Sequence, residues 1–121
     1  MRIQESAEDY LEAILVLKQQ KGVVHSIDVA RHLNFSKPSV SRAVKLLRED
    51  EKLTMSADGA LELTEKGLEI AARIYERHQL LTRWFVELGV SEAQAAEDAC
   101  RVEHDISAET FQKLKEHFGA I

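Results

Sequence analysis

One stretch of the sequence decides the fold: Ser36-Lys37-Pro38-Ser39-Val40-Ser41-Arg42-Ala43-Val44-Lys45-Leu46-Leu47-Arg48. Its apolar side chains recur at helical spacing, which places Val40, Val44 and Leu47 on one face of a helix. Ser36 is a residue type that caps helix N-termini, and Pro38 falls in the first turn, where its missing N–H costs nothing. The stretch therefore predicts a short helix with a basic, hydroxyl-rich outer face.

A second short helix is expected just before this one, opened by Ser26 and followed by a turn at Asn34-Phe35. Two short helices joined by a tight turn form a helix-turn-helix, whose second helix enters the major groove of DNA. We expect base contacts from Arg42 and phosphate contacts from Ser36, Lys37, Ser39 and Lys45, with Pro38 and Ser41 on the same outward face. The alternative is a basic, solvated helix in an all-α bundle. The acids that follow, Glu49-Asp50-Glu51, must point away from DNA or bind nearby bases.

The rest of the chain predicts a mainly α fold. A hairpin is indicated by partly alternating residues 53–56 and 60–64 on either side of Asp58-Gly59, and a hairpin in this place is a wing, here without Lys or Arg. A first helix is expected from Ser6 to Lys21, and a long helix from a Thr64 cap almost to Gly89. Two shorter helices follow, with caps at Ser91 and Ser107. We expect a winged helix-turn-helix domain over residues 1–64 and a helical domain over residues 65–121, with the long linking helix at 65–88.

Charge is distributed unevenly along these 121 residues, whose net charge is −5. Residues 26–48 hold five bases against one acid, whereas residues 91–121 hold seven acids against three bases. Separated charge of this kind indicates two tasks on one chain. No apolar run approaches the roughly 20 residues of a membrane span, the N-terminus lacks a signal peptide's apolar core, and one cysteine forms no internal disulfide. We therefore expect a cytoplasmic protein without a membrane segment.

Three side chains with metal-ligand chemistry lie close together in the sequence. Cys100, Glu103 and His104 follow an i, i+3, i+4 pattern, which puts a thiol, a carboxylate and an imidazole on one helix face. Such a mixture suits a divalent transition metal, but three residues do not complete its ligand shell.

Candidates for the missing ligands lie on two other helices. Asp9 and Glu12 are spaced i, i+3 on the first helix, and His78 lies midway along the long helix. Taken singly, each has an ordinary explanation as a helix-start acid, a solvated glutamate or a surface histidine. We interpret His25, His32 and His117 as incidental, because they have no such companions.

The last helices offer apolar side chains that so short a segment buries poorly alone. We expect a second copy of the chain to cover them, in a homodimer. They are Trp84, Ala95, Ala99, Val102, Ile106 and Phe111.

Together these features resemble the diphtheria toxin repressor family of metal-dependent transcriptional regulators. The likeness covers essentially the whole chain. The segments that carry it are Asp9-Tyr10-Leu11-Glu12-Ala13-Ile14, Ser36-Lys37-Pro38-Ser39-Val40-Ser41, Leu63-Thr64-Glu65-Lys66-Gly67, Arg77-His78-Gln79-Leu80-Leu81 and Glu97-Asp98-Ala99-Cys100-Arg101-Val102-Glu103-His104. The last of these is the most specific.

The resemblance implies a C-terminal domain for metal binding and dimerisation, and a repressor of metal-uptake or metal-homeostasis genes. Members of the family bind Fe(II) or Mn(II) as co-repressor and then bind palindromic operators. In length the chain is similar to the manganese transport regulators, so we expect no SH3-like domain of the iron-type repressors.

The ligands implied by the resemblance are a hybrid. Asp9 stands where manganese-type members have Asp, Glu12 and His78 match their two-metal arrangement, and Cys100 is the iron-type residue. The iron-type ancillary acid and histidine fall on Thr82 and Ala96. We expect a primary site of Asp9, Cys100, Glu103 and His104, and a weaker second site of Glu12 and His78 that shares Glu103. The thiolate favours Fe(II), Co(II) or Zn(II), while three carboxylates keep Mn(II) open, so one or two metals of either kind remain possible.

Two other functions are consistent with the residues. One is a metal-independent winged-helix regulator in which Cys100 is a redox switch. The other is a metal-dependent hydrolase with Glu103 or Glu12 as general base, but the sequence offers no nucleophile motif or pocket-forming glycine-rich loop. We expect a regulator rather than an enzyme.

Overall fold

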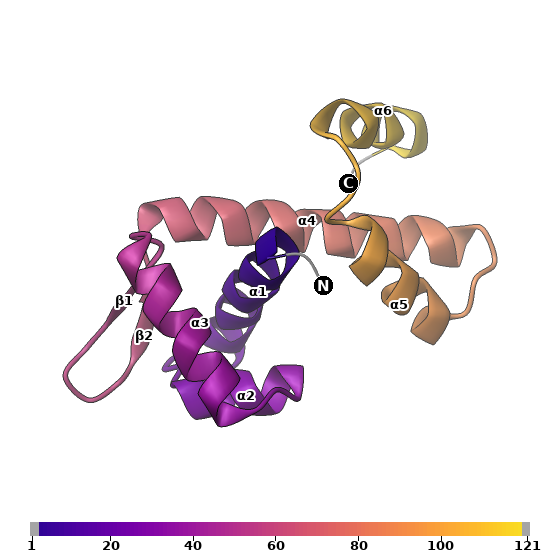
Figure 1. Cartoon of the computed structure of the whole chain (residues 1–121). Helices are drawn as coiled ribbons and strands as arrows, with labels where there is room; N and C mark the ends of the chain where they lie inside the picture. The colour runs from indigo at the N-terminus through magenta and orange to yellow at the C-terminus, as the bar shows by residue number, and fades with distance from the viewer. Residues whose placement is uncertain (1–2, 120–121) are drawn as a thin grey trace. The chain divides into compact units, whose positions relative to one another are not determined.

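The computed structural model describes residues 3–119, which form six helices and one two-stranded antiparallel sheet (Figure 1). This mainly α architecture and the winged helix-turn-helix are as the sequence predicts. In chain order the elements are α1 (Ile3–Lys21), α2 (Ser26–Leu33), α3 (Lys37–Glu49), β1 (Leu53–Met55), β2 (Leu61–Leu63), α4 (Glu65–Glu87), α5 (Glu92–Val102) and α6 (Ala108–Phe118).

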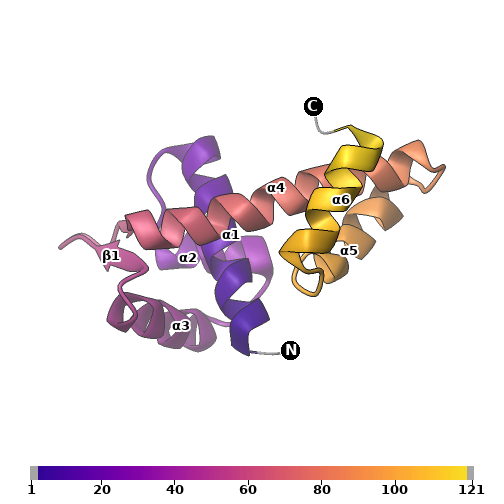
Figure 2. The same ribbon diagram turned by 90° about the horizontal axis from the view of Figure 1, so that it is seen from above.

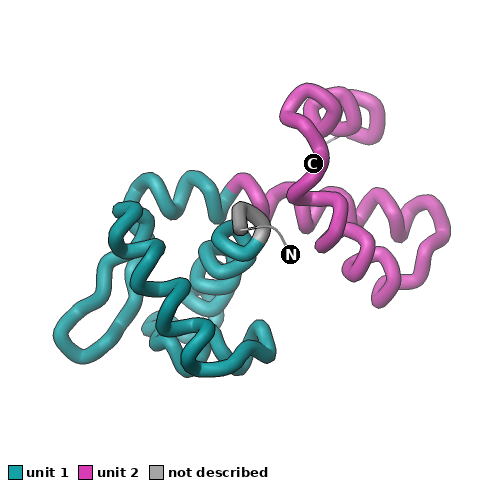
Figure 3. Tube along the Cα trace, viewed as in Figure 1, with its two compact units in different colours: residues 1–72 teal, residues 73–121 magenta. Residues whose placement is uncertain are grey.

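The chain divides into two compact units, residues 1–72 and residues 73–121 (Figure 3). The division falls inside α4, whereas the sequence places its domain boundary just before that helix. The first turns of α4 therefore belong to the N-terminal unit.

The core of the N-terminal unit joins α1 to the helix-turn-helix. Leu11 and Ile14 of α1 are buried together with Val29 of α2 and with Val40 and Val44 of α3. Burial of this apolar surface fixes α1 against the two helices of the motif. The ring of Tyr10 also packs edge-on against Phe35, with centroids 5.7 Å apart.

The wing is a short hairpin whose register pairs Leu53 with Leu63 and Met55 with Leu61. Its turn uses Gly59 at φ +87°, a backbone conformation that favours glycine. On the other edge, Val24 forms a bridge with Leu61, whose N–H donates to the Val24 carbonyl at 2.7 Å. The residue before His25 thus adds a single β-bridge to the free edge of β2 and no further strand.

Serine and threonine caps begin the later helices where the sequence predicts them. The side chains of Ser36, Ser91 and Ser107 accept backbone N–H bonds three residues on, at 3.3, 3.4 and 3.0 Å. Thr64 accepts the N–H of Gly67 at 3.1 Å. The expected start of the first helix at Ser6 is wrong: α1 already runs from Ile3, because the residues before Ser6 are compatible with helix.

The C-terminal unit consists of the later part of α4 together with α5 and α6 (Figure 2). These helices share an aromatic core. The Trp84 ring stacks on Phe118 with centroids 5.4 Å apart and lies 5.7 Å from Phe111. Trp84, Ala95, Ala99 and Phe111 are buried, and Val102 and Ile106 are partly buried against this core. For the four buried residues, the expectation of an apolar surface that a second copy covers is therefore wrong: a helical wheel identifies the apolar side of a helix but not what covers it.

Candidate metal centre and DNA-binding surface

The outer face of α3 has the composition that the sequence predicts. Lys37, Pro38, Ser41, Arg42 and Lys45 are exposed, whereas Val40, Val44 and Leu47 are buried. At the start of the helix the Ser36 hydroxyl lies 2.8 Å from that of Ser39, which in turn accepts a 3.5 Å bond from Arg42 Nη2. The helix thus presents cations and hydroxyls to one side and an apolar anchor to the other.

One of the acids after α3 is neutralised locally. The Asp50 carboxylate lies 2.7 Å from Lys52 Nζ, and Lys66 Nζ donates to the Asp50 backbone carbonyl at 3.3 Å. The hydrogen bond from Lys52 holds the pKa of the Asp50 carboxyl below its usual range. For Asp50, the expectation that an acid here binds a nearby base is confirmed.

Glu103 is the most deeply buried acid of the C-terminal unit. It caps α5, its N–H donates to the Ala99 carbonyl at 2.9 Å, and its side chain is 0% exposed. The helix ends at Val102, so Glu103 and His104 lie in the turn beyond it and not, as the sequence suggests, inside the helix. Glu103 nevertheless keeps helical dihedral angles (φ −59°, ψ −26°), so the spacing from Cys100 is retained.

Two imidazoles flank this carboxylate. His78 Nδ1 of α4 lies 2.9 Å from Glu103 Oε2, and His104 Nε2 lies 3.5 Å from Glu103 Oε1. The His78 side chain is 30% exposed and that of His104 only 3%. Among residues 3–119, nothing donates a hydrogen bond to Glu103 Oε1. A buried carboxylate with an unsatisfied oxygen is costly unless a cation compensates it, and two nitrogens beside it are further ligands for a divalent metal.

A buried arginine holds the turn that carries this carboxylate. Arg77 Nη1 donates to the Glu103 carbonyl at 3.0 Å and to the Ile106 carbonyl at 2.7 Å, and its guanidinium carbon lies 5.4 Å from the Phe111 ring centroid. The sequence alone indicates no role for Arg77. Its only signal was its position next to His78, since the two carbonyls it binds are more than 25 residues away in the chain.

The other three predicted ligands lie on α5 and α1. Cys100 is exposed on α5, one turn before Glu103. Asp9 and Glu12 are half-buried on α1 of the N-terminal unit, spaced i, i+3. Within the C-terminal unit the structure thus brings together His78, Glu103 and His104.

Comparison with known proteins decides the family. A model described as the N-terminal DNA binding domain of iron dependent repressors matches residues 2–61, and one described as their metal binding and dimerisation domain matches residues 64–121. An HTH-type transcriptional regulator of Methanocaldococcus jannaschii is 34% identical over 113 residues, which cover 92% of this chain and 90% of that protein. The chain belongs to the iron-dependent repressor family.

Other members of the family are similar over most of the chain. The HTH-type transcriptional regulator MntR of Geobacillus kaustophilus is 35% identical over 109 residues, 90% of this chain and 77% of that protein. The solved structure of the manganese regulator SloR matches with a TM-score of 0.82 at 26% identity. The match covers 93% of this chain and 53% of the SloR chain, so this chain spans about half the length of that solved structure.

As an iron-dependent repressor, the chain is a metal-dependent, DNA-binding transcriptional regulator. Its partners are double-stranded DNA and, through the dimerisation domain, a second copy of itself. The resemblance drawn from the sequence motifs is confirmed. No helix within the described part of the chain is long and apolar enough to cross a membrane.

Proposed function

We propose that this repressor controls metal-uptake or metal-homeostasis genes in response to Fe(II) or Mn(II) held at Glu103. The observation that carries the proposal is the fully buried Glu103 carboxylate, with one unsatisfied oxygen, between His78 and His104. Desolvating a carboxylate costs several kcal/mol unless an opposite charge compensates it. A bound divalent cation would supply that charge.

Asp9, Cys100, Glu103 and His104 would hold the primary metal. Glu12 and His78 would hold a second, with Glu103 shared between the two. Thiolate and imidazole donors favour Fe(II), with Co(II) and Zn(II) as substitutes in vitro, and the carboxylates favour Mn(II). The family description names iron, and the similar SloR is a manganese regulator, so both metals belong in the test.

The position of Asp9 and Glu12 on α1 would couple metal binding to DNA binding. Both lie on α1, whose buried face packs on α2 and α3. Next to Asp9, the buried Tyr10 packs on Phe35, which lies just before α3. Burial raises the pKa of the Tyr10 hydroxyl, while the charge of Arg42 lowers this pKa and that of Asp9 raises it. A constraint on α1 is therefore a constraint on the orientation of the helix that reads DNA.

The mechanism that follows is linkage. In a dimer, two α3 helices must reach half-sites of a palindrome about one duplex turn apart, or a multiple of it. Without a metal, the ligand carboxylates and the Cys100 thiol would repel one another or bind protons, and α1 would be less constrained. Metal binding would remove that repulsion. Because binding free energies couple in both directions, operator DNA should tighten metal binding by the factor with which metal tightens DNA binding.

The test is an anaerobic titration of Mn(II), Fe(II), Co(II) and Zn(II) against binding to a palindromic operator candidate, with a chelator control. Metal-dependent binding that the chelator reverses is the expected result. If chelation leaves operator binding unchanged while peroxide abolishes it, the metal-independent alternative with Cys100 as a redox switch replaces the proposal.

Two further features complete the proposal. We expect no catalytic turnover, because the ligands would fill the coordination shell and leave no open position for a substrate. We also expect a cytoplasmic location, where a regulator has access to DNA. Hydrolysis that survives Arg42→Ala but not His104→Ala would contradict the first of these expectations.

A further inference from the structure

The wing of this repressor carries no positive charge of its own. Residues 53–63 contain no Lys or Arg, and their charged side chains are Asp58 and Glu62. The Glu62 carboxylate is paired with Lys18 of α1. The wing therefore has no cation of its own to neutralise a phosphate.

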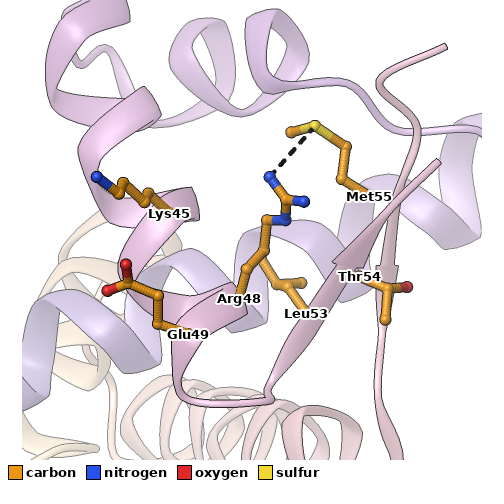
Figure 4. A pocket seen from close by; sticks show the side chains of 6 residues that line it. All are labelled: Lys45, Arg48, Glu49, Leu53, Thr54 and Met55. Atoms are coloured by element: carbon orange, nitrogen blue, oxygen red, sulfur yellow. Dashed lines mark hydrogen bonds between the residues drawn. The ribbon is translucent and has the colours of Figure 1, made fainter. Parts of the chain in front are cut away.

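A cation from α3 lies against the wing instead. Between α3 and β1 is a groove of about 600 Å³, lined by Lys45, Arg48, Glu49, Leu53, Thr54 and Met55 (Figure 4). Arg48 crosses this groove, and its Nη1 lies 3.9 Å from the sulfur of Met55 on β1. A thioether is a weak acceptor, and a guanidinium has five N–H donors, so this contact orients Arg48 while leaving it donors for a ligand.

We propose that Arg48 supplies the wing's contact with a DNA phosphate, and that Met55 is its positioning residue. The proposal rests on the DNA-binding role of α3. Guanidinium binds phosphate oxygens through two parallel N–H bonds, and Lys45, one turn earlier on α3, brings a second cation to the same groove. Glu49 is the opposing charge there, so two bases outweigh one acid.

The first experiment measures how operator affinity depends on salt. Arg48→Gln should weaken binding to operator and to unrelated DNA alike, and should reduce the slope of log K against log salt by about one per protomer. Lys113→Gln on α6, which removes one positive charge from a side chain that is 72% exposed, is the matched control and should leave both unchanged. An unchanged slope for Arg48→Gln would overturn the proposal. A lower melting temperature with unchanged DNA binding would also overturn it, because Arg48 would then only stabilise the wing.

The second experiment locates the phosphate. A single uncharged methylphosphonate is placed in turn at each backbone position of one half-site. At one position it should weaken binding of the wild-type protein several-fold while costing Arg48→Gln nothing, and Met55→Leu should fall between them. Identical profiles for wild type and Arg48→Gln would contradict a direct contact.

A variant of opposite sign provides an independent check. Glu49→Gln removes the carboxylate that opposes a phosphate in the groove, so it should bind DNA more tightly than wild type. Unchanged or weaker binding would show that no phosphate enters the groove.

Discussion

Glu103 shows how much of the proposed site depends on a single side chain. Its carboxylate is fully buried, contacts two imidazoles and keeps one oxygen unsatisfied within the described residues. Arg77 fixes the backbone beneath it through two carbonyls. Such a group is held in place before any metal arrives, which lowers the cost of ordering the ligands on binding.

Cys100 provides a spectroscopic test at the residue scale. If its thiolate is a ligand, the Co(II)-loaded protein should show a thiolate-to-cobalt charge-transfer band in the near ultraviolet. Cys100→Ser should lose this band and keep the weaker visible bands, because Glu103 and His104 remain. A wild-type protein that binds Co(II) without a charge-transfer band would exclude Cys100 from the site.

Asp28 makes the stability of the N-terminal unit depend on pH. Its carboxylate pairs with Lys21 and accepts the His25 N–H at 2.9 Å, and these bonds, the one from Lys21 first, lower its pKa. A depressed carboxyl pKa contributes stability above the unfolded value of about 3.9, and this stability is lost as the pH falls through the folded value. Asp28→Asn should therefore cost about 1 kcal/mol of unfolding free energy near neutrality.

The measurement is urea unfolding of wild type and Asp28→Asn at neutral and at acid pH. The two proteins should differ at neutral pH and converge in acid, where the carboxylate of the wild type is protonated. A difference of the same size at both pH values would show that the charge of Asp28 contributes nothing.

At the scale of elements, the start of α4 packs without spare room. A Cβ added at Gly67 would lie 2.1 Å from the carbonyl oxygen of Lys52, which is backbone and cannot move aside cheaply. Gly67→Ala should therefore destabilise the protein by about 1–3 kcal/mol, although alanine is the better helix former by about 1 kcal/mol. Denaturant unfolding measures the change, and Ala72→Gly, at an exposed position of the same helix, gives the propensity effect alone. A Gly67→Ala protein as stable as wild type would contradict the close approach.

The elements themselves were largely predictable because their signals are local. Caps such as Ser36 and Ser91 act on an N–H three residues away, and the single apolar face of α3 follows from helical spacing. The role of Arg77 and the burial of Trp84 were not predictable, because each depends on contacts with α5 or α6 that only tertiary packing brings together. The end of α5 at Val102 is not predictable for the same reason: Arg77 binds backbone carbonyls of the turn beyond it.

At the scale of the whole molecule, the two family domains divide the work between DNA and metal. Basic residues gather in 26–48 and acidic ones in 91–121, as each partner requires. The six proposed ligands include Asp9 and Glu12 of the N-terminal unit together with side chains of the C-terminal unit. Local sequence patterns identified all six candidates, but not how they act together, since that depends on residues up to 95 positions apart, from Asp9 to His104.

The central claim is that a metal at Glu103 controls DNA binding, and one comparison tests it most directly. Operator affinity is measured for wild type and Glu103→Gln, each with Mn(II) or Fe(II) and with chelator, alongside the dimer mass of both proteins. We predict that metal strengthens operator binding by wild type at least tenfold, about 1.4 kcal/mol or more, and leaves the dimeric Glu103→Gln unchanged. A Glu103→Gln protein that still binds the operator in a metal-dependent way would contradict the account.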